Sequence, residues 1–424
     1  MRRSALLTLL PLLALQLPAF DDYRCSEVCL HEENQPIKNT DSLDDALSHG
    51  HFHAHIRVAH ISQKEDAVDS KTTYGTTVGG ELQYQTANFY NFSATISAYI
   101  SQKIAPLSGD FHQDKLNTDF FNQNGESIAY LGESYLEYQK EKLNIRLGRQ
   151  QLDTPFNDRD DIRMLPNTFS ALTVGYGGIE HFVFMAGYVN AWAGFDSGED
   201  ISKFKDFPGE NSNGKGAWIL GVQNDSFDNL ELQGWYYSVD KLANILYFDA
   251  NYETQYNNLN TVTGVQFAHY TEQGSSTIDG DIVGLNAEIA FSRLHLGVAY
   301  NNVNTPKRKK LIIGYGGGPY FTSMEEMTID GINNAKAYRF FAQVSLQPVA
   351  EDLTLLYAYG YFSGNDGSDN SLKVVNDEND LVLTYPLNEK LDFELSYANI
   401  RDKQQNNNNN TGYKRVLARL NYFF

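Results

Sequence analysis

One pattern governs most of the sequence: from His51 onward, segments of roughly ten residues alternate between polar and apolar side chains, and each ends in a turn. The clearest segment runs from Asn91 to Ser101 and places on one face Phe92, Ala94, Ile96, Ala98 and Ile100. Because strand side chains point alternately to the two faces of a sheet, each segment is predicted to be a β-strand with one apolar and one polar face. A helical pattern occurs in one short piece, Ser42 to Ser48.

The segments are long for a soluble sheet. They run for about 9–13 residues, close to the roughly 9–11 that cross a bilayer when tilted and about twice the usual strand of a soluble sheet. We therefore predict an all-β fold, a transmembrane antiparallel β-barrel of eighteen strands, with sixteen as the nearest alternative. The strands are expected at residues 51–62, 75–87, 90–101, 127–139, 142–151, 168–176, 181–190, 216–223, 229–238, 243–254, 258–270, 281–291, 293–301, 336–347, 352–361, 379–386, 391–400 and 412–424.

The connections between these strands alternate in length, as they do in outer-membrane barrels with short periplasmic turns and long extracellular loops. The short turns are expected near residues 87–90, 139–142, 177–181, 224–229, 255–258, 291–293, 347–352 and 386–390. Long polar loops are expected at residues 102–126, 191–215, 302–334 and 362–379. The last strand ends on Phe424, an aromatic terminus of the kind that the outer-membrane assembly machinery recognises.

Composition excludes other classes of protein. The 424 residues carry a formal net charge of −20, which disfavours nucleic-acid binding because phosphates would be repelled. The 27 Tyr and 25 Phe are too many for a disordered chain. Past residue 20, no apolar stretch reaches the roughly 18–20 residues of a membrane-spanning helix.

The N-terminal residues indicate export. Arg2 and Arg3 precede an apolar run from Ala5 to Leu15, which predicts a secretory signal peptide over residues 1–19, cleaved after Ala19. We expect residues 20–50 to form a periplasmic segment with a short helix and residues 51–424 to form the barrel, in the outer membrane of a Gram-negative bacterium.

The N-terminal segment also holds the two cysteines of the chain, Cys25 and Cys29. Disulfides persist outside the cytoplasm, so a local bridge between them is one candidate. Their spacing does not match a catalytic redox motif, and the residues before Cys25 do not form a lipoprotein cleavage signal. No cofactor or metal is expected.

A barrel of 16–18 strands is wide enough for an aqueous lumen, and a charge facing lipid at mid-bilayer costs about 2–4 kcal/mol. Charged strand residues are therefore expected to point inward. Strand phase, meaning the face on which the two-residue alternation places a side chain, assigns to this inward set Arg57, Arg146, Arg293, Arg339, Arg415, Arg419, Glu81, Glu133, Glu137, Glu231, Asp249, Glu288, Asp392 and Glu394. Both signs of charge are present, which favours a pore with a transverse field.

The densest charged segment runs from Arg146 to Pro166 and forms the third loop with its approach strand. It resembles the OprD family of outer-membrane porins, which carry a "Gly-Arg … Pro … Asp-x-Arg-hydrophobic-hydrophobic-Pro" block there, and a weaker likeness lies at Gly316–Met324. The resemblance implies an eighteen-stranded channel for amino acids or small carboxylates, in which an arginine ladder faces acidic loop residues. The channel-lining residues would then be Arg146, Arg149, Asp153, Asp158, Arg159, Asp160, Asp161 and Arg163, with the ladder at Arg146, Arg149 and Arg163. Alternatively, these ions only fix the loop to the wall.

Other charged groups have less specific interpretations. His51, His53 and His55 share one strand face, but residues two apart lie about 6.6–6.8 Å apart, too far for three ligands of one zinc ion. They are expected to line the lumen, either as plain polar wall or as a pH-sensitive lining. Lys307–Lys310 is expected either to meet anionic lipopolysaccharide or to be a solvated loop.

The sequence thus predicts a porin for passive, partly selective diffusion of small hydrophilic solutes, present as a monomer or a homotrimer. A structural or adhesive surface barrel is the alternative, and a barrel-based outer-membrane hydrolase is a weaker one because no nucleophile motif is visible. We expect no enzymatic activity and no nucleic-acid partner.

Overall fold

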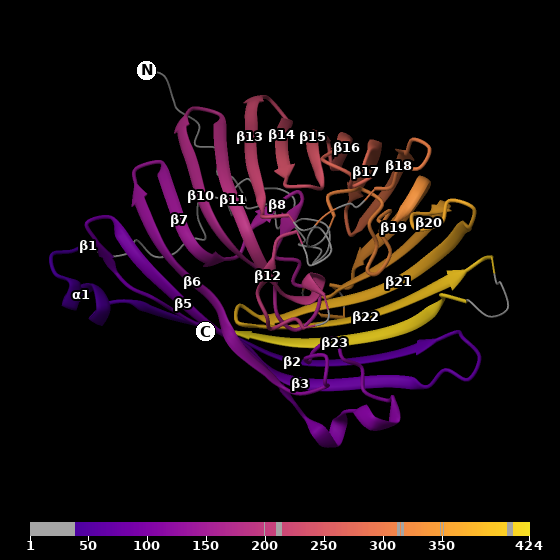
Figure 1. Cartoon of the computed structure of the whole chain (residues 1–424), viewed down its shortest axis with the longest axis horizontal. Coiled ribbons are helices and arrows are strands. Elements are labelled where there is room, and N and C mark those ends of the chain that lie inside the picture. The colour runs from indigo at the N-terminus through magenta and orange to yellow at the C-terminus, as the bar shows by residue number, and fades with distance from the viewer. Residues whose placement is uncertain are drawn as a thin grey trace.

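The computed structural model describes residues 39–198, 200–208, 214–311, 314, 318–347, 349–350, 352–404 and 410–424. Eighteen long antiparallel strands form one closed barrel (Figure 1), as the alternation predicted. The strands are β2 (His51–Glu65), β3 (Thr72–Gln85), β5 (Phe92–Lys103), β6 (Ile128–Lys140), β7 (Leu143–Gln150), β10 (Thr168–Ile179), β11 (Phe182–Ala193), β13 (Ala217–Phe227), β14 (Leu230–Val239), β15 (Ala243–Tyr256), β16 (Leu259–Glu272), β17 (Gly280–Phe291), β18 (Leu294–Asn304), β19 (Ile332–Ser345), β20 (Thr354–Asp366), β21 (Lys373–Asn388), β22 (Leu391–Asp402) and β23 (Tyr413–Phe423).

The first and last long strands close the barrel. β2 pairs antiparallel with β23 from the pair His55 and Phe423 to the pair Glu65 and Tyr413. The final residue extends this seam, because the Ala54 N–H donates to the Phe424 carbonyl oxygen at 3.1 Å and the Phe424 N–H donates back at 2.9 Å. Closure leaves no long strand of the barrel with an unpaired edge.

Several short elements accompany the barrel. Helix α1 (Leu43–Ser48) lies where the sequence predicted a helix, and Ser42 caps it by accepting the Asp45 N–H at 3.0 Å. No helix of the described ranges is long and apolar enough to cross a membrane. The remaining short elements are β1 (Asn39–Thr40), β4 (Asn88–Phe89), β8 (Asp153–Thr154), β9 (Asn157–Asp158), β12 (Lys205–Asp206) and the 3₁₀ turns η1 (Ala105–Leu107), η2 (Phe111–Gln113) and η3 (Phe195–Ser197).

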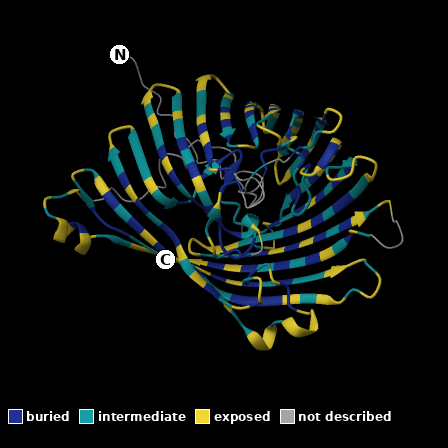
Figure 2. Cartoon of the chain, viewed as in Figure 1, coloured by how far each residue is buried: buried dark blue, intermediate teal, exposed yellow. Residues whose placement is uncertain are grey.

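Burial alternates along the strands, as Figure 2 shows. Outward side chains such as Leu147, Leu172 and Val298 are exposed, as an apolar belt in contact with lipid requires. One connection differs from the prediction. The long loop expected at residues 362–379 is a hairpin, because β20 continues to Asp366 and β21 begins at Lys373. Outside the bilayer both faces of a strand meet water, so alternation stops marking its ends.

The predicted signal peptide and the Cys25–Cys29 bridge lie outside the described residues. Within the barrel, segments of the long loops pack against the inner wall. One apolar cluster gathers around Phe156 and the inner faces of β14–β16, and a second gathers around Phe120, Phe121 and Met164. The interior is therefore partly filled by loops instead of being lined by strands alone.

Candidate functional site

The loop between β7 and β10, residues 151–167, crosses the barrel interior. Its first half forms the small hairpin of β8, seen inside the barrel in Figure 1, and β9. Phe156 lies in the two-residue turn between these strands. The Phe156 ring is fully buried and contacts four tyrosine rings edge-on, with centroid distances of 5.1, 5.5, 6.0 and 6.2 Å. These rings belong to Tyr237, Tyr247, Tyr270 and Tyr320. The hairpin is thus anchored to β14–β16 by apolar packing.

The second half of the loop reaches the opposite wall, where β2 and β23 meet. Asp161 accepts two hydrogen bonds from Arg57, both of 2.7 Å, one to each carboxylate oxygen. Arg57 also donates to the carbonyl oxygens of Arg163 and Met164, at 3.1 and 3.3 Å, and Arg419 donates to the Asp161 carbonyl oxygen. Burial opposes ionisation of Asp161, but the charges of Arg57 and Arg419 outweigh it and hold the pKa of this carboxyl at about 2.

Three arginines from these two adjacent strands point into the barrel. Arg57 lies on β2, and Arg415 and Arg419 lie on β23. Arg419 donates to Glu394 of β22 at 2.7 and 3.2 Å, while Arg57 donates to Asn421 at 2.6 Å. Strand phase predicted an inward orientation for all three.

A second long loop, between β18 and β19, brings acidic groups to the same wall. Glu326 pairs with Arg415 and accepts the Tyr413 hydroxyl at 3.0 Å. The loop backbone is held from β21, because the N–H groups of Glu326 and Met327 donate to Glu378 at 3.0 and 2.8 Å. The arginines of β2 and β23 are therefore matched by acids from two inward loops and from β22.

Glu325, next to Glu326, lies among further acids. Its N–H donates to Asp380 of β21 at 3.3 Å. Burial raises the pKa of the Glu325 carboxyl to about 7, and the nearby carboxylates of Asp380 and Glu394 add to this effect. The charge of this loop residue therefore changes near neutral pH.

Arg163 joins the loops to one another. Its side chain is 6% exposed and donates to Asp119 of the β5–β6 loop and to Glu326 of the β18–β19 loop, both at 3.2 Å. The guanidinium also lies over the ring of Phe195, from the β11–β13 loop, at 4.4 Å from its centroid. Four loops therefore meet at one side chain, so Arg163 holds loops together and is not an exposed rung of a ladder.

The other charged residues predicted within this loop have local partners. Arg159 pairs with Asp153 at 3.3 Å across the β8–β9 hairpin, and Asp158 accepts the Asp160 N–H at 3.0 Å. Asp161 reaches Arg57 on the wall.

Arg146 lies on the inner wall but on another sector. It donates to Glu137 of β6 at 2.7 Å, and its guanidinium lies 5.3 Å from the Tyr135 ring centroid. Nearby, Glu133 accepts from Gln83 at 2.9 Å and from the Gln151 N–H at 3.2 Å. The predicted lumen residues Glu133 and Glu137 are therefore beside the start of the inward loop.

Two predicted residues are not part of this inner wall. Arg149 shares the outward strand face of Leu147, donates to the Leu131 carbonyl oxygen at 3.2 Å and stacks on Phe204 at 4.1 Å. Arg293 is exposed in the two-residue turn between β17 and β18. Arg149 was assigned to the ladder from the family resemblance, whereas strand phase groups it with the outward Leu147. The prediction for Arg293 failed because the strand expected to begin at residue 293 begins at Leu294.

The remaining lumen candidates lie on the barrel wall. His55 contacts Asn421 at 3.0 Å and stacks on Phe423, and the rings of His51 and His53 are 6.5 Å apart. Across the described ranges, no three His, Asp or Glu side chains are arranged to hold a metal ion. Arg339 is buried on β19 and donates to the Phe321 carbonyl oxygen at 3.3 Å.

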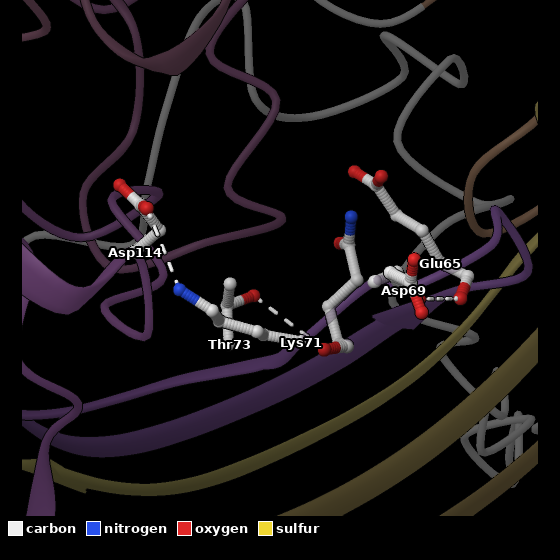
Figure 3. A pocket seen from close by; sticks show the side chains of 7 residues that line it. Glu65, Asp69, Lys71, Thr73 and Asp114 are labelled. Atoms are coloured by element: carbon white, nitrogen blue, oxygen red, sulfur yellow. Dashed lines mark hydrogen bonds and ion pairs between the residues drawn. The ribbon is translucent and has the colours of Figure 1, made fainter.

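A surface hollow of about 280 Å³ lies apart from these contacts, at the tip of the β2–β3 hairpin (Figure 3). Lys71 pairs there with Asp114 at 3.6 Å, and the other lining residues are Gln63, Glu65, Asp69, Ser70 and Thr73. It is open to solvent and does not adjoin the arginines at the closing seam.

Comparison with known proteins identifies the family. The family model of the OprD outer membrane porins matches residues 133–422. The chain belongs to the OprD family. It is therefore an outer-membrane porin of a Gram-negative bacterium, as the loop motif and the barrel pattern predicted.

Solved structures show the same fold at low sequence identity. Pseudomonas aeruginosa OccK9 (OpdG) is 12% identical with a TM-score of 0.76, covering 89% of this chain and 100% of that chain. P. aeruginosa OpdK with vanillate is 12% identical with a TM-score of 0.73, covering 89% and 99%. Acinetobacter baumannii OccAB4 is 15% identical with a TM-score of 0.73, covering 92% and 99%. Among curated proteins, no sequence matches the chain.

Proposed function

We propose that this porin selects small solutes that carry a carboxylate, such as amino acids or small carboxylates, and that Arg57 and Arg419 are the groups that attract them. The observation that carries this proposal is the two-point contact between Arg57 and Asp161. A guanidinium that binds a protein carboxylate in this way has the geometry to bind a solute carboxylate instead.

The arrangement of charge supports partial selectivity. Arg57 and Arg419 are compensated by Asp161 and Glu394, so the wall presents both signs of charge within a few side chains. A solute with a carboxylate and an ammonium group could replace both partners of such an ion pair. A neutral solute gains nothing from this field, and a free anion also meets the acids of the loops.

The fold relatives are consistent with this class of solute. The OpdK structure was obtained with vanillate, a compound with one carboxylate group. The analogy concerns chemistry only, since the two chains share 12% identity.

Liposome swelling with a small carboxylate and a neutral sugar of similar size tests the proposal. Arg57→Gln should slow carboxylate entry by roughly ten- to a hundredfold, because a charge-assisted hydrogen bond contributes about 1.5–3 kcal/mol, while sugar entry stays within about twofold. Arg57→Lys, which keeps the charge but not the two-point contact, should lie between wild type and Arg57→Gln.

Arg149→Gln is the matched control, since it removes one arginine from the outward strand face. It should leave both rates unchanged. If Arg57→Gln instead changes carboxylate and sugar entry equally, Arg57 acts only as an anchor for the loop and the proposal is wrong.

The finer partners stay predictions. Three predictions each need their own test. They are recognition of Phe424 by the assembly machinery, contact of Lys307–Lys310 with lipopolysaccharide, and a monomeric or trimeric state. In the structure Lys307 and Arg308 are exposed, whereas Lys309 pairs with Glu272 at 2.5 Å.

A further inference from the structure

A group of cations lies on the outward side of β19–β22, toward the long-loop end of the barrel. Lys336 lies near the start of β19, Arg401 near the end of β22, and Lys403 directly after it. Strand register aligns them across the wall. Lys336 is opposite Ser363, and the Lys403 N–H bonds the carbonyl oxygen of Val375, which itself pairs with Ser363.

Two of these cations are organised by one buried acid. Asp377 of β21 accepts from Arg401 Nε and Nη2 at 2.7 and 2.8 Å, and it pairs with Lys403 Nζ at 2.8 Å. The Asp377 side chain is 2% exposed, while Arg401 and Lys403 are 47% and 41% exposed. The acid thus lies beneath two cations that remain accessible from outside.

The charge of this group is not balanced locally. One carboxylate compensates only one of the two cations that it binds. Lys336 is exposed, and among the described side chains no acid lies within ion-pair distance of its ammonium group. The surface made by Lys336, Asp377, Arg401 and Lys403, here called the basic wall patch, therefore carries a net charge of +2.

The depth of the patch in the membrane follows from the outward residues below it. Tyr338 and Tyr361 are register neighbours of Asp377, and Phe340 and Leu381 continue the outward face toward mid-barrel. Aromatic residues mark the interface at each edge of the apolar belt, so the cations just beyond the tyrosines lie at the level of lipid headgroups.

The basic wall patch differs from β14–β18, although two further outward lysines, Lys64 and Lys414, lie on the neighbouring strands β2 and β23. At the corresponding level on β14–β18, the outward residues are uncharged or acidic, for example Ser238, Asn244, Asp281 and Asn302. An ion-pair network that served only to neutralise Asp377 would need a single cation. Two accessible cations share this one acid, and the exposed Lys336 lies on the same outward face, which together indicate a surface for an external anion.

We propose that the basic wall patch binds phosphate groups of lipopolysaccharide in the outer leaflet. Arg401 contacts Asp377 through Nε and Nη2, so Arg401 Nη1 is not part of that contact. Lys403 Nζ has further hydrogens to donate beyond its pair with Asp377. Arginine and lysine side chains held at headgroup depth are suited to phosphate recognition. This inference is independent of the proposed solute selectivity.

The test compares two variants of the full-length porin with a control. Lys336→Gln removes one cation and leaves the Asp377 pairs intact. The second variant combines Lys336→Gln, Asp377→Asn, Arg401→Gln and Lys403→Gln, so that no buried carboxylate loses its partners. The control, Lys140→Gln with Lys142→Gln, makes the same net change of two charges at the short-turn end, where both lysines are exposed.

Binding of purified lipid A is measured for each protein in detergent, with dephosphorylated lipid A and inorganic phosphate as separate arms. Removing one cation is expected to weaken lipid A binding about fivefold, because each cation near an anionic surface raises the affinity by roughly that factor. The combined variant should weaken binding by a larger factor. The control should bind as wild type does, and dephosphorylated lipid A should not distinguish the proteins.

Equal lipid A binding by wild type and the combined variant, with both folded as judged by their resistance to heat in detergent, would overturn the proposal. So would an equal loss in the control, which would indicate a general charge effect. Binding of inorganic phosphate as tightly as lipid A would replace lipopolysaccharide by free phosphate as the ligand and equally reject the proposal.

Discussion

The two ends of the inward loop 151–167 are held by opposite kinds of chemistry. Phe156 is enclosed by tyrosine rings on β14–β16, whereas Asp161 and Arg163 are held by ion pairs at the β2–β23 wall and to other loops. Apolar packing is insensitive to salt and offers nothing to a charged solute. Ion pairs can exchange partners, so the charged end of the loop is the end suited to transport.

The largest effect is expected at the apolar end. Phe156→Ala should lower the stability of the barrel by about 3–5 kcal/mol, because truncating a buried aromatic leaves a cavity among four rings. The freed hairpin should also give larger and noisier single-channel currents in planar bilayers. Heat denaturation in detergent and bilayer recording measure the two effects.

Phe340→Ala, which truncates an aromatic on the lipid-facing side of β19, is the control for Phe156→Ala. It should change stability much less and leave the currents unaltered. Unchanged currents in Phe156→Ala would mean that the ion pairs alone hold the loop.

The next effect is expected at the junction of the four loops. Arg163→Gln and Glu326→Gln each leave a buried charge without one partner, which costs about 2–5 kcal/mol, and each should raise single-channel conductance as the loops separate. Exchanging the two charges, Arg163→Glu with Glu326→Arg, should not restore the wild-type conductance, because position 326 would then repel Arg415 and position 163 would repel Asp119. If each single variant conducts as wild type does, the contact at Arg163 does not define the width of the channel.

The smallest effects are expected from pH. The pKa of Asp161, about 2, lies below its ordinary value of 3.8, so its stabilising contact with Arg57 is complete above about pH 4 and is lost as pH falls toward 2. Wild-type conductance should therefore change below about pH 4, and Asp161→Asn should remove this dependence.

Glu325 should respond in the opposite direction. Its pKa of about 7 lies above the ordinary value of 4.5, so the folded protein retains a proton that the unfolded chain releases, and the stability contribution declines as pH rises from 4.5 to 7. Ionisation near pH 7 should also increase cation preference, measured as a shift in reversal potential between pH 6 and 8. Glu325→Gln should abolish that shift, and a shift that persists would assign it to another group.

The alternation of side chains along the strands predicted which charged residues of the wall face inward. The period of two placed Arg57, Arg415, Arg419 and Glu394 on the inner face, and the alternation of short and long connections gave the barrel its topology. Phase is defined only within a regular strand. Arg293 falls in a turn, so its phase had no meaning, whereas Arg149 was assigned inward from the family resemblance and lies on the outward face that strand phase gives it.

The contacts between loops were beyond this kind of reasoning. Arg163 meets Asp119 and Glu326, which are 44 and 163 residues away in the chain. Loop residues have no period, so neither acid carried a signal that would connect it to Arg163. The family motif indicated that Arg163 matters in the channel, but it did not distinguish a solute contact from a junction of loops.

The sequence by itself determined the barrel, because lipid outside and polar groups inside impose one alternating pattern on every spanning strand. The tertiary structure decided which charges meet, since an ion pair depends on distances of a few ångströms between segments that the closed barrel brings together. For this reason Asp161 of the inward loop meets Arg57 at the β2–β23 wall, while Arg146 pairs with Glu137 on a different sector of the wall.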